Sequence, residues 1–222
     1  MLYIVSTPIG NLKDITLRAI ETLKSVDLIA AEDTRHTKIL LDAYEIKIPT
    51  TSFFEHNQTR KSQDILKLLK EGKSVALVTD AGTPGISDPG YPLIQLALEN
   101  NIAMTVVPGT TAFVMALTLS GLPAHAFVFE GFLPVKSGGR RKKLEELKAE
   151  KRTVIVYESP HRLLKTLKDI EEVLENPVIV CARELTKKFE EVKKAATSDL
   201  LAHFCQHPPR GEFVLLWNLE KS

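Results

Sequence analysis

The sequence predicts an α/β fold with two domains, an N-terminal one on a largely parallel sheet and a C-terminal one on a mixed sheet. Short apolar runs alternate with longer amphipathic stretches through residues 1–121, the order that produces right-handed βαβ units. The turn residues Gly121 and Pro123 then mark a junction. Beyond it, residues 186–192 alternate only weakly between apolar and polar side chains, which favours a mixed sheet. We therefore expect domains at residues 1–121 and 122–222.

Hydrophobic periodicity places the expected elements of each domain. Strands of the N-terminal domain are expected at residues 2–6, 27–31, 49–54, 74–79 and 103–107. Its helices are expected at residues 16–24, 61–70, 92–99 and 112–119. A further helix is expected to begin after Thr34, which would be its N-cap. Strands of the C-terminal domain are expected at residues 126–130, 153–157, 178–182, 188–194 and 212–219. Its helices are expected at residues 140–151, 160–174 and 198–204.

The composition is that of an ordinary globular protein. The 222 residues are 44% hydrophobic and 26% charged, and the formal net charge of +1 does not by itself indicate a nucleic-acid binder. The two cysteines, Cys181 and Cys205, have no repeated spacing, which argues against a disulfide scaffold or a cysteine-rich zinc site. The chain begins with a strand-like run instead of a basic leader, and no apolar stretch is long enough to span a bilayer. We therefore expect a cytoplasmic protein.

The N-terminal domain is organised around residues 75–90. The apolar run at residues 75–78 predicts a buried strand. Residues 80–90 then contain three glycines, two prolines and two aspartates, so neither strand nor helix can continue there. A buried strand that opens onto such a loop is how open α/β sheets form ligand sites, at the carboxyl ends of their strands. The alternative is a long surface loop without a function.

Other segments are expected to meet this loop. The segments that follow residues 6, 31, 79 and 107 all leave the carboxyl ends of strands, so they share one edge of a parallel sheet. The residues expected to converge there are Gly10, Glu32, Asp33, Arg35, His36, Asp80 and Gly109. This shared edge predicts a ligand site.

Common signatures for phosphate, metal and hydrolase sites are missing from the sequence. Neither GxGxxG nor GxxxxGK[ST] occurs, so we expect a ligand approached by backbone groups. None of the six histidines has the HExxH spacing of a zinc site, and we expect no metal. Asp80 is either an acceptor for a ribose or an ammonium group of the ligand, or an Asx-turn acceptor for its own loop.

Basic residues form two groups in the C-terminal domain. The first follows Gly138 and Gly139 and contains Arg140, Arg141, Lys142 and Lys143. The second contains Arg183, Lys187 and Lys188. The first group is either a flexible, phosphate-gripping lid or a solvated helix face that nearby glutamates balance.

Seven short strings occur in order along almost the whole chain. They are TPIGNL at residues 7–12, AAEDTR at 30–35, DAGTPGISDPG at 80–90, EGFLP at 130–134, YESPHR at 157–162, ARELTKK at 182–188 and GE at 211–212. In these strings the chain closely resembles the bacterial small-subunit rRNA methyltransferases of the tetrapyrrole-methylase superfamily. One departure is visible, because that family's pattern has Pro-Ser where this chain has Thr110 and Thr111.

The resemblance implies an S-adenosyl-L-methionine-dependent 2′-O-methylation of a cytidine ribose in 16S rRNA. It also implies a homodimer without a metal, acting on the small ribosomal subunit, with the cofactor between the two domains. The cofactor contacts that it implies are Pro8, Gly10, Asp80, Ala81, Gly82, Thr83, Thr111, Ala112, Val156, Tyr157, Ala182, Arg183, Pro209 and Arg210.

Candidates for the chemistry and for RNA binding complete the set of expected site residues. Catalytic candidates are Glu158, Arg162, Arg183 and Glu184, with Glu32 and Asp33 as further carboxylates. Expected RNA contacts are Arg35, Arg140, Arg141, Lys142, Lys143, Lys187 and Lys188. Two alternatives stay open. One is methylation of a tetrapyrrole or a diphthamide precursor on the same fold, and the other is a non-catalytic RNA-binding module.

Overall fold

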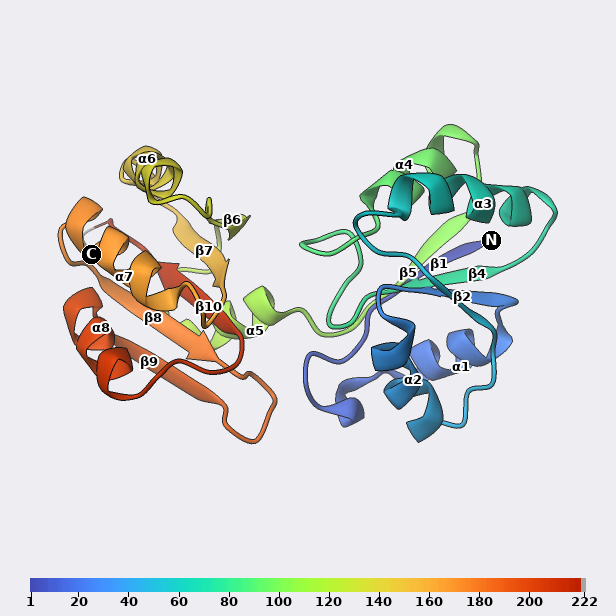
Figure 1. Ribbon diagram of the computed structural model, residues 1–222, viewed down its shortest axis with the longest axis horizontal. Coiled ribbons are helices and arrows are strands. Elements are labelled where there is room, and N and C mark those ends of the chain that lie inside the picture. The colour runs from blue at the N-terminus through green and yellow to red at the C-terminus, as the bar shows by residue number, and fades with distance from the viewer. Residues whose placement is uncertain (221–222) are drawn as a thin grey trace. The chain divides into compact units, whose positions relative to one another are not determined.

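The computed structural model describes residues 1–220 and divides the chain into two compact units, Met1–Thr111 and Ala112–Ser222 (Figure 1). Each unit is built on one five-stranded sheet. In the described residues, no helix is both long and apolar enough to cross a membrane.

The first unit contains a fully parallel sheet with the strand order β3-β2-β4-β1-β5. Its strands are β1 (Leu2–Val5), β2 (Leu28–Ala31), β3 (Thr50–Ser52), β4 (Val75–Val78) and β5 (Met104–Val107). The central strand β4 is buried along its whole length, as its run of apolar residues predicts. The expected parallel sheet is therefore confirmed.

Helices cover both faces of this sheet (Figure 1). They are α1 (Leu17–Ser25), α2 (Thr34–Ala43), α3 (Gln58–Lys70) and α4 (Tyr91–Glu99), with a short 3₁₀ turn η1 (Leu12–Asp14) after β1. One hydrophobic core contains Leu23 of α1 and Leu41 of α2, and a second contains Ile65 of α3 and Leu93 of α4. Each pair of helices thus buries its apolar stripe against its own face of the sheet.

The strand order explains why the helices divide in this way. The connections from β1 to β2 and from β2 to β3 step toward one edge of the sheet, whereas those from β3 to β4 and from β4 to β5 step toward the other. Right-handed crossovers that step in opposite directions leave the sheet on opposite faces. The connections that follow the neighbouring strands β1 and β4 therefore lead to helices on opposite faces, and such a switch point is where open α/β sheets bind ligands.

The second unit contains a mixed sheet with the order β6-β7-β10-β8-β9. Its strands are β6 (Phe127–Phe132), β7 (Thr153–Glu158), β8 (Val178–Arg183), β9 (Glu191–Ala196) and β10 (Phe213–Trp217). Strands β6 and β7 are parallel, and the other three pairings are antiparallel. The expected mixed sheet is confirmed, and with it the predicted fold class.

Four helices pack on the second sheet. They are α5 (Ala112–Ser120), α6 (Ser137–Leu147), α7 (Leu163–Val173) and α8 (Thr197–Gln206). The main core joins α6, α7 and α8 to one face through residues such as Leu144, Leu167 and Phe204 around Trp217. Helix α5 contacts β7, β8, β9 and β10 and is absent from that core, so it packs on the other face.

The boundary between the compact units differs from the expected domain boundary. The sequence placed helix 112–119 in the first domain and the junction at Gly121, because turn residues follow that helix. In the structure α5 packs on the second sheet, and the units divide between Thr111 and Ala112. Sequence periodicity identifies this helix, but it does not say which of two sheets the helix covers.

Helix α6 also differs from its prediction. It begins at Ser137 and ends at Leu147, so Gly138 and Gly139 lie in its first turn and do not form a flexible lid. Two side chains of that turn, Ser137 and Arg140, bond to Asp169 of α7. This tertiary anchor compensates for the low helix propensity of two adjacent glycines.

Candidate functional site

The loops after β1 and β4 are joined at the switch point of the first sheet. An isolated antiparallel bridge pairs Thr7 with Gly82, with the Thr7 amide donating to the Gly82 carbonyl at 2.9 Å and the Gly82 amide donating back at 3.1 Å. The Thr7 hydroxyl donates to the Thr79 carbonyl at 3.0 Å. Gly82 has a φ of 81°, a conformation that glycine adopts without strain. The two loops therefore form one rigid edge.

A chain of hydroxyl groups connects the loop after β5 to the same edge. The Thr83 hydroxyl lies 2.9 Å from the Ser6 hydroxyl and 3.0 Å from the Thr111 hydroxyl. The Thr110 hydroxyl donates to the Thr7 carbonyl at 3.0 Å. Both threonines at the position where the chain departs from its family pattern thus bind neighbouring loops. Ser6 and Thr110 were not among the site residues expected from the sequence. Their positions, Ser6 directly after a strand and Thr110 directly after Gly109, are a signal that could have identified them.

Close backbone approach explains the glycine of the β5 loop. A Cβ added to Gly109 would lie 2.8 Å from the Cβ of Ser6, a distance that real side chains avoid. The segments after β1, β4 and β5 accordingly meet as the sequence predicts.

Two carboxylates connect the β2 end to the same edge. The Asp80 amide donates to Oε2 of Glu32 at 3.2 Å, and the Asp33 amide donates to Oδ1 of Asp80 at 3.1 Å. Each carboxylate thus binds the backbone of the segment that carries the other. Asp80 does accept a backbone bond, but the donor belongs to the β2 segment and not to its own loop. Its second oxygen keeps acceptor capacity for a ligand.

The environment of Glu32 favours its neutral form. Burial is the largest factor that raises the pKa of this carboxyl, and the neighbouring charges of Asp80 and Asp33 raise it further. The amide of Asp80 and the charge of His36 oppose the shift but do not cancel it. A half-buried carboxyl with a raised pKa at a strand end has the properties of a proton acceptor.

The raised pKa of Glu32 predicts a pH-dependent stability difference. Because the folded pKa lies above the ordinary value of 4.5, Glu32 favours folding below pH 4.5 and loses that contribution as the pH rises through its folded pKa. We expect Glu32→Gln to gain stability relative to the unchanged protein over that window, and the difference to stay constant at higher pH. Urea unfolding at a series of pH values measures it, with the exposed Glu21→Gln as a control. A difference that is constant from pH 4 to 8 contradicts the assignment.

In the AAEDTR segment, the residues that follow Glu32 are partly or fully exposed, whereas Ala30 and Ala31 before it are buried. Asp33 is the N-cap of α2, because its side chain accepts a bond from the Arg35 amide, so the expected cap at Thr34 is wrong. The Arg35 guanidinium pairs with Asp33 at 2.7 Å, although the Arg35 side chain is 90% exposed. This pairing lowers the pKa of Asp33 well below its usual range. His36 is exposed on the same turn.

In the second unit, the register of the sheet brings the expected cofactor residues to one end. Tyr157 of β7 and Ala182 of β8 both pair with Val214 of β10. Arg183 pairs with the preceding residue of β10, Phe213. The Tyr157 hydroxyl accepts a bond from the Phe113 amide at 3.2 Å, beside Ala112 at the start of α5. Val156 is buried, whereas Pro209 and Arg210 lie in the loop before β10.

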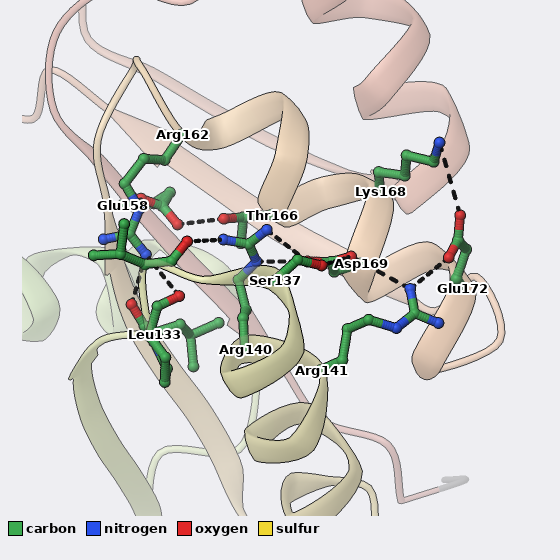
Figure 2. Close-up of polar contacts among 12 residues, drawn as sticks. Leu133, Ser137, Arg140, Arg141, Glu158, Arg162, Thr166, Lys168, Asp169 and Glu172 are labelled. Carbon is green, nitrogen blue, oxygen red and sulfur yellow. Dashed lines mark hydrogen bonds and ion pairs between the residues drawn. The ribbon is translucent and has the colours of Figure 1, made fainter.

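Glu158 and Arg162 hold backbone segments together (Figure 2). The fully buried Glu158 side chain accepts bonds from the Ser159 amide at 2.7 Å and the Thr166 hydroxyl at 2.5 Å. Arg162 lies 3.4 Å from Glu158 and donates to the Leu133 carbonyl at 2.5 Å. The Arg162 side chain thereby attaches the segment after β6 to the start of α7.

Arg140 forms a second anchor beside this one (Figure 2). Its guanidinium pairs with Asp169 at 2.6 Å, and only 3% of the Arg140 side chain is exposed. It also donates to the Val135 carbonyl at 3.1 Å. Arg140 is therefore a structural residue, and its expected contact with RNA phosphate is not possible in this conformation. The partner of Arg140 could not be identified from the sequence, because Asp169 looks like any polar position of an amphipathic helix.

The remaining basic residues differ in availability. Arg141 pairs with Glu172 at 2.5 Å, and Lys143 pairs with Glu130 at 2.8 Å. Within residues 1–220, Lys142 and Lys188 have no carboxylate at salt-bridge distance. Of the expected RNA contacts, these two are therefore available to an anionic partner.

Arg183 and Glu184 do not pair as neighbours. Arg183 pairs with Glu191 at 3.1 Å. Glu184 accepts bonds from the Lys187 ammonium at 2.9 Å and from the Glu212 amide at 3.1 Å. Burial acts to raise the pKa of Glu184, but these bonds outweigh it and hold the pKa below its usual value. Glu184 therefore joins two loops as a carboxylate.

Comparison with known proteins gives a consistent family. The sequence profile described as "Tetrapyrrole (Corrin/Porphyrin) Methylases" matches residues 1–201. A protein of Thermotoga maritima named ribosomal RNA small subunit methyltransferase I is 48% identical over 97% of this chain and 96% of its own length. Proteins of the same name from Synechocystis and Escherichia coli O157:H7 are 49% and 50% identical over 97% of this chain, and these matches cover 78% and 76% of their lengths.

Solved structures agree on the fold. The methyltransferase CobJ superposes with a TM-score of 0.73 at 16% identity, over 100% of this chain and 96% of its own. A diphthine synthase superposes with a TM-score of 0.74 at 12% identity, over 98% of this chain and 88% of its own. At these identities the likeness extends to the fold alone.

Proposed function

Since this chain belongs to the tetrapyrrole (corrin/porphyrin) methylase family, we propose that it is an S-adenosyl-L-methionine-dependent methyltransferase of 16S rRNA that methylates the 2′-oxygen of a cytidine ribose. One observation carries the proposal. Proteins named for methylation of small-subunit ribosomal RNA are 48–50% identical to this chain over 97% of its length, whereas the structures of tetrapyrrole and diphthine enzymes reach only 12–20%.

The first unit's edge fits the methyl donor. Asp80 offers a carboxylate oxygen for an ammonium group or a ribose hydroxyl, and the hydroxyls of Thr83 and Thr111 lie 3.0 Å apart on the same edge of the sheet. Gly109 lets the loop after β5 approach Ser6 closely, since a Cβ there would lie 2.8 Å from the Ser6 Cβ. The expected contacts Pro8, Gly10 and Ala81 lie in the same two loops. In the second unit, the proposed contacts are Ala112, Val156, Tyr157, Ala182, Arg183, Pro209 and Arg210.

The residues of this chain have two tasks in such a reaction. When bound, S-adenosyl-L-methionine supplies a methyl group that its sulfonium activates. The protein aligns the ribose oxygen with that methyl group, and alignment of this kind is worth up to roughly 7–11 kcal/mol. It also accepts the hydroxyl proton, which typically contributes a 10²–10⁴-fold effect.

Glu32 is the carboxylate best suited to accept that proton. Its pKa is raised mainly by burial, and one of its oxygens is engaged by the Asp80 amide, which fixes the orientation of the group. Glu158, Arg162 and Glu184 are proposed instead as positioning residues, because each holds backbone segments together. Arg183 follows Ala182 in β8, and its guanidinium forms an ion pair with Glu191.

The basic side of α6 is proposed to contact rRNA phosphates through Lys142 and Lys143. We expect the double change Lys142→Ala and Lys143→Ala to weaken RNA binding and to reduce the slope of log K against log salt by roughly 1–2, one for each lost phosphate contact. Cofactor affinity should stay the same. Binding at several salt concentrations measures the slope, and an unchanged slope refutes the contact.

Assembly and location complete the proposal. The protein acts in the cytoplasm as a homodimer on the small ribosomal subunit. Exposed apolar side chains of the second unit, such as Leu119 and Phe132 at 53% each, are available for a dimer contact. Sedimentation equilibrium tests this, and a monomer at micromolar concentration contradicts it.

Methyl transfer from labelled S-adenosyl-L-methionine tests the function. Purified small ribosomal subunits, naked 16S rRNA and a corrin precursor serve as parallel acceptors. We expect label in the ribosomal RNA and none in the corrin. Label in the corrin alone refutes the proposal in favour of a tetrapyrrole methylase. Binding of RNA without methyl transfer or cofactor binding refutes it in favour of a non-catalytic RNA-binding module.

A further inference from the structure

The turn that joins β8 to β9, residues 184–190, carries an exposed aromatic ring. In Figure 1 this orange turn extends beyond the ends of its two strands. Phe189 is 65% exposed there, whereas Leu185 of the same turn is only 5% exposed. Leu185 therefore anchors the turn, and packing within the unit does not account for Phe189.

A cation accompanies the ring. The Lys188 ammonium lies 5.6 Å from the centroid of the Phe189 ring, within the range of a cation–π interaction. Within residues 1–220, Lys188 has no carboxylate at salt-bridge distance. An exposed ring beside an available ammonium is the combination by which proteins hold single-stranded nucleic acid, because a base stacks on the ring and a phosphate binds the cation.

The turn is held rigid by bonds to a neighbouring loop. The Glu184 amide donates to the Glu212 carbonyl at 3.1 Å, and the Lys187 ammonium bridges Glu184 at 2.9 Å and Glu212 at 2.6 Å. The Thr186 amide donates to the Glu190 carboxylate at 2.6 Å. These contacts occupy the three glutamates and fix the turn, so little ordering entropy is lost when it binds.

Gly211 is required for this arrangement. A Cβ at Gly211 would lie 2.3 Å from the carboxyl group of Glu184, and the φ of Gly211 is 85°. Glu184 and Thr186 themselves have positive φ values of 49° and 66°, which cost energy in residues other than glycine. The surrounding contacts thus maintain a conformation that the turn would not adopt by itself.

We propose that Phe189 is a base-stacking platform for a single-stranded segment of the RNA substrate, with Lys188 binding the adjacent phosphate. This inference rests on the proposed function and adds a substrate contact that sequence patterns did not suggest. Lys187, which was expected to bind RNA, instead holds the turn in place.

Binding of naked 16S rRNA and of purified small subunits tests the platform. We expect Phe189→Ala to weaken binding by about 5- to 150-fold, the range reported for loss of one stacked base, and Phe189→Trp to retain it. Lys188→Ala should lower the salt slope by roughly 1. Val178→Ala is the matched control, because Val178 is 54% exposed at the other end of the β8–β9 hairpin.

The possible results separate this inference from the proposed function. If the unchanged protein methylates RNA and Phe189→Ala binds RNA equally well, the platform is refuted and the function stands. If Phe189→Ala lowers the Tm or abolishes a dimer while RNA affinity is unchanged, the ring packs against protein and the platform is also refuted. If the unchanged protein neither binds nor methylates RNA, the proposed function fails. Gly211→Ala should weaken RNA binding, because its Cβ would displace Glu184 from the turn, and wild-type RNA affinity in that variant contradicts the role of the rigid turn.

Discussion

Replacement of Asp169 by alanine is expected to lower the free energy of unfolding of the second unit by about 3–5 kcal/mol, the usual cost of leaving one partner of a buried ion pair alone. Arg140 is 3% exposed and bonds to Asp169 at 2.6 Å, so the change leaves a guanidinium without its counter-charge in a desolvated position. The hydroxyl of Ser137 loses its acceptor as well. Urea unfolding followed by circular dichroism measures the effect.

Two further variants separate burial from charge. Glu172→Ala removes the partner of Arg141 and Lys168, where the Glu172 side chain is 44% exposed, and should cost at most about 1 kcal/mol. The double change Arg140→Met with Asp169→Leu removes both charges and should recover much of the lost stability. A single Asp169→Ala as mild as Glu172→Ala contradicts the assignment of a buried anchor.

Replacement of Asp80 by asparagine is expected to weaken binding of S-adenosyl-L-methionine by about 10- to 150-fold, since a hydrogen bond to a charged group contributes about 1.5–3 kcal/mol. Asparagine keeps an oxygen for the Asp33 amide, so the joint between β2 and β4 is preserved and only the charge is lost. Asp80→Ala loses both the charge and the bond from the Asp33 amide, and should also destabilise the first unit.

Calorimetric titration with the cofactor measures the Asp80 effect. Asp42→Asn is the control, because Asp42 forms an exposed pair with Lys38 on α2, away from the strand ends. If Asp80→Asn binds the cofactor with wild-type affinity, the charge of Asp80 has no role in cofactor binding.

The first unit could be predicted closely because local patterns determine it. Short apolar runs such as that of β4 predict the strands, and the amphipathic stretches between them predict the helices. This βαβ order implies a parallel sheet with right-handed connections, and therefore one edge at which the segments with Glu32 and Asp80 both begin. Gly109 is required by its close approach to Ser6, and Gly82 by its φ of 81°.

The second unit was harder because its decisive contacts join distant residues. Arg140 looked like part of a solvated basic run until Asp169, 29 residues later, supplied a buried partner. Glu184 is adjacent to Arg183 in the sequence but bonds to Lys187 and Glu212. Charge patterns show which residues are ionic, whereas only the packing of α6 on α7 and of the two loops decides which of them are engaged internally.

The central claim is that the chain methylates the 2′-oxygen of a cytidine in small-subunit ribosomal RNA. Its most direct test is nucleoside analysis of 16S rRNA after reaction with labelled S-adenosyl-L-methionine, in which the RNA is digested completely and the labelled nucleoside is identified by mass spectrometry. The predicted result is label in 2′-O-methylcytidine alone. Label in a base-methylated nucleoside, or no label in the RNA, would contradict the account.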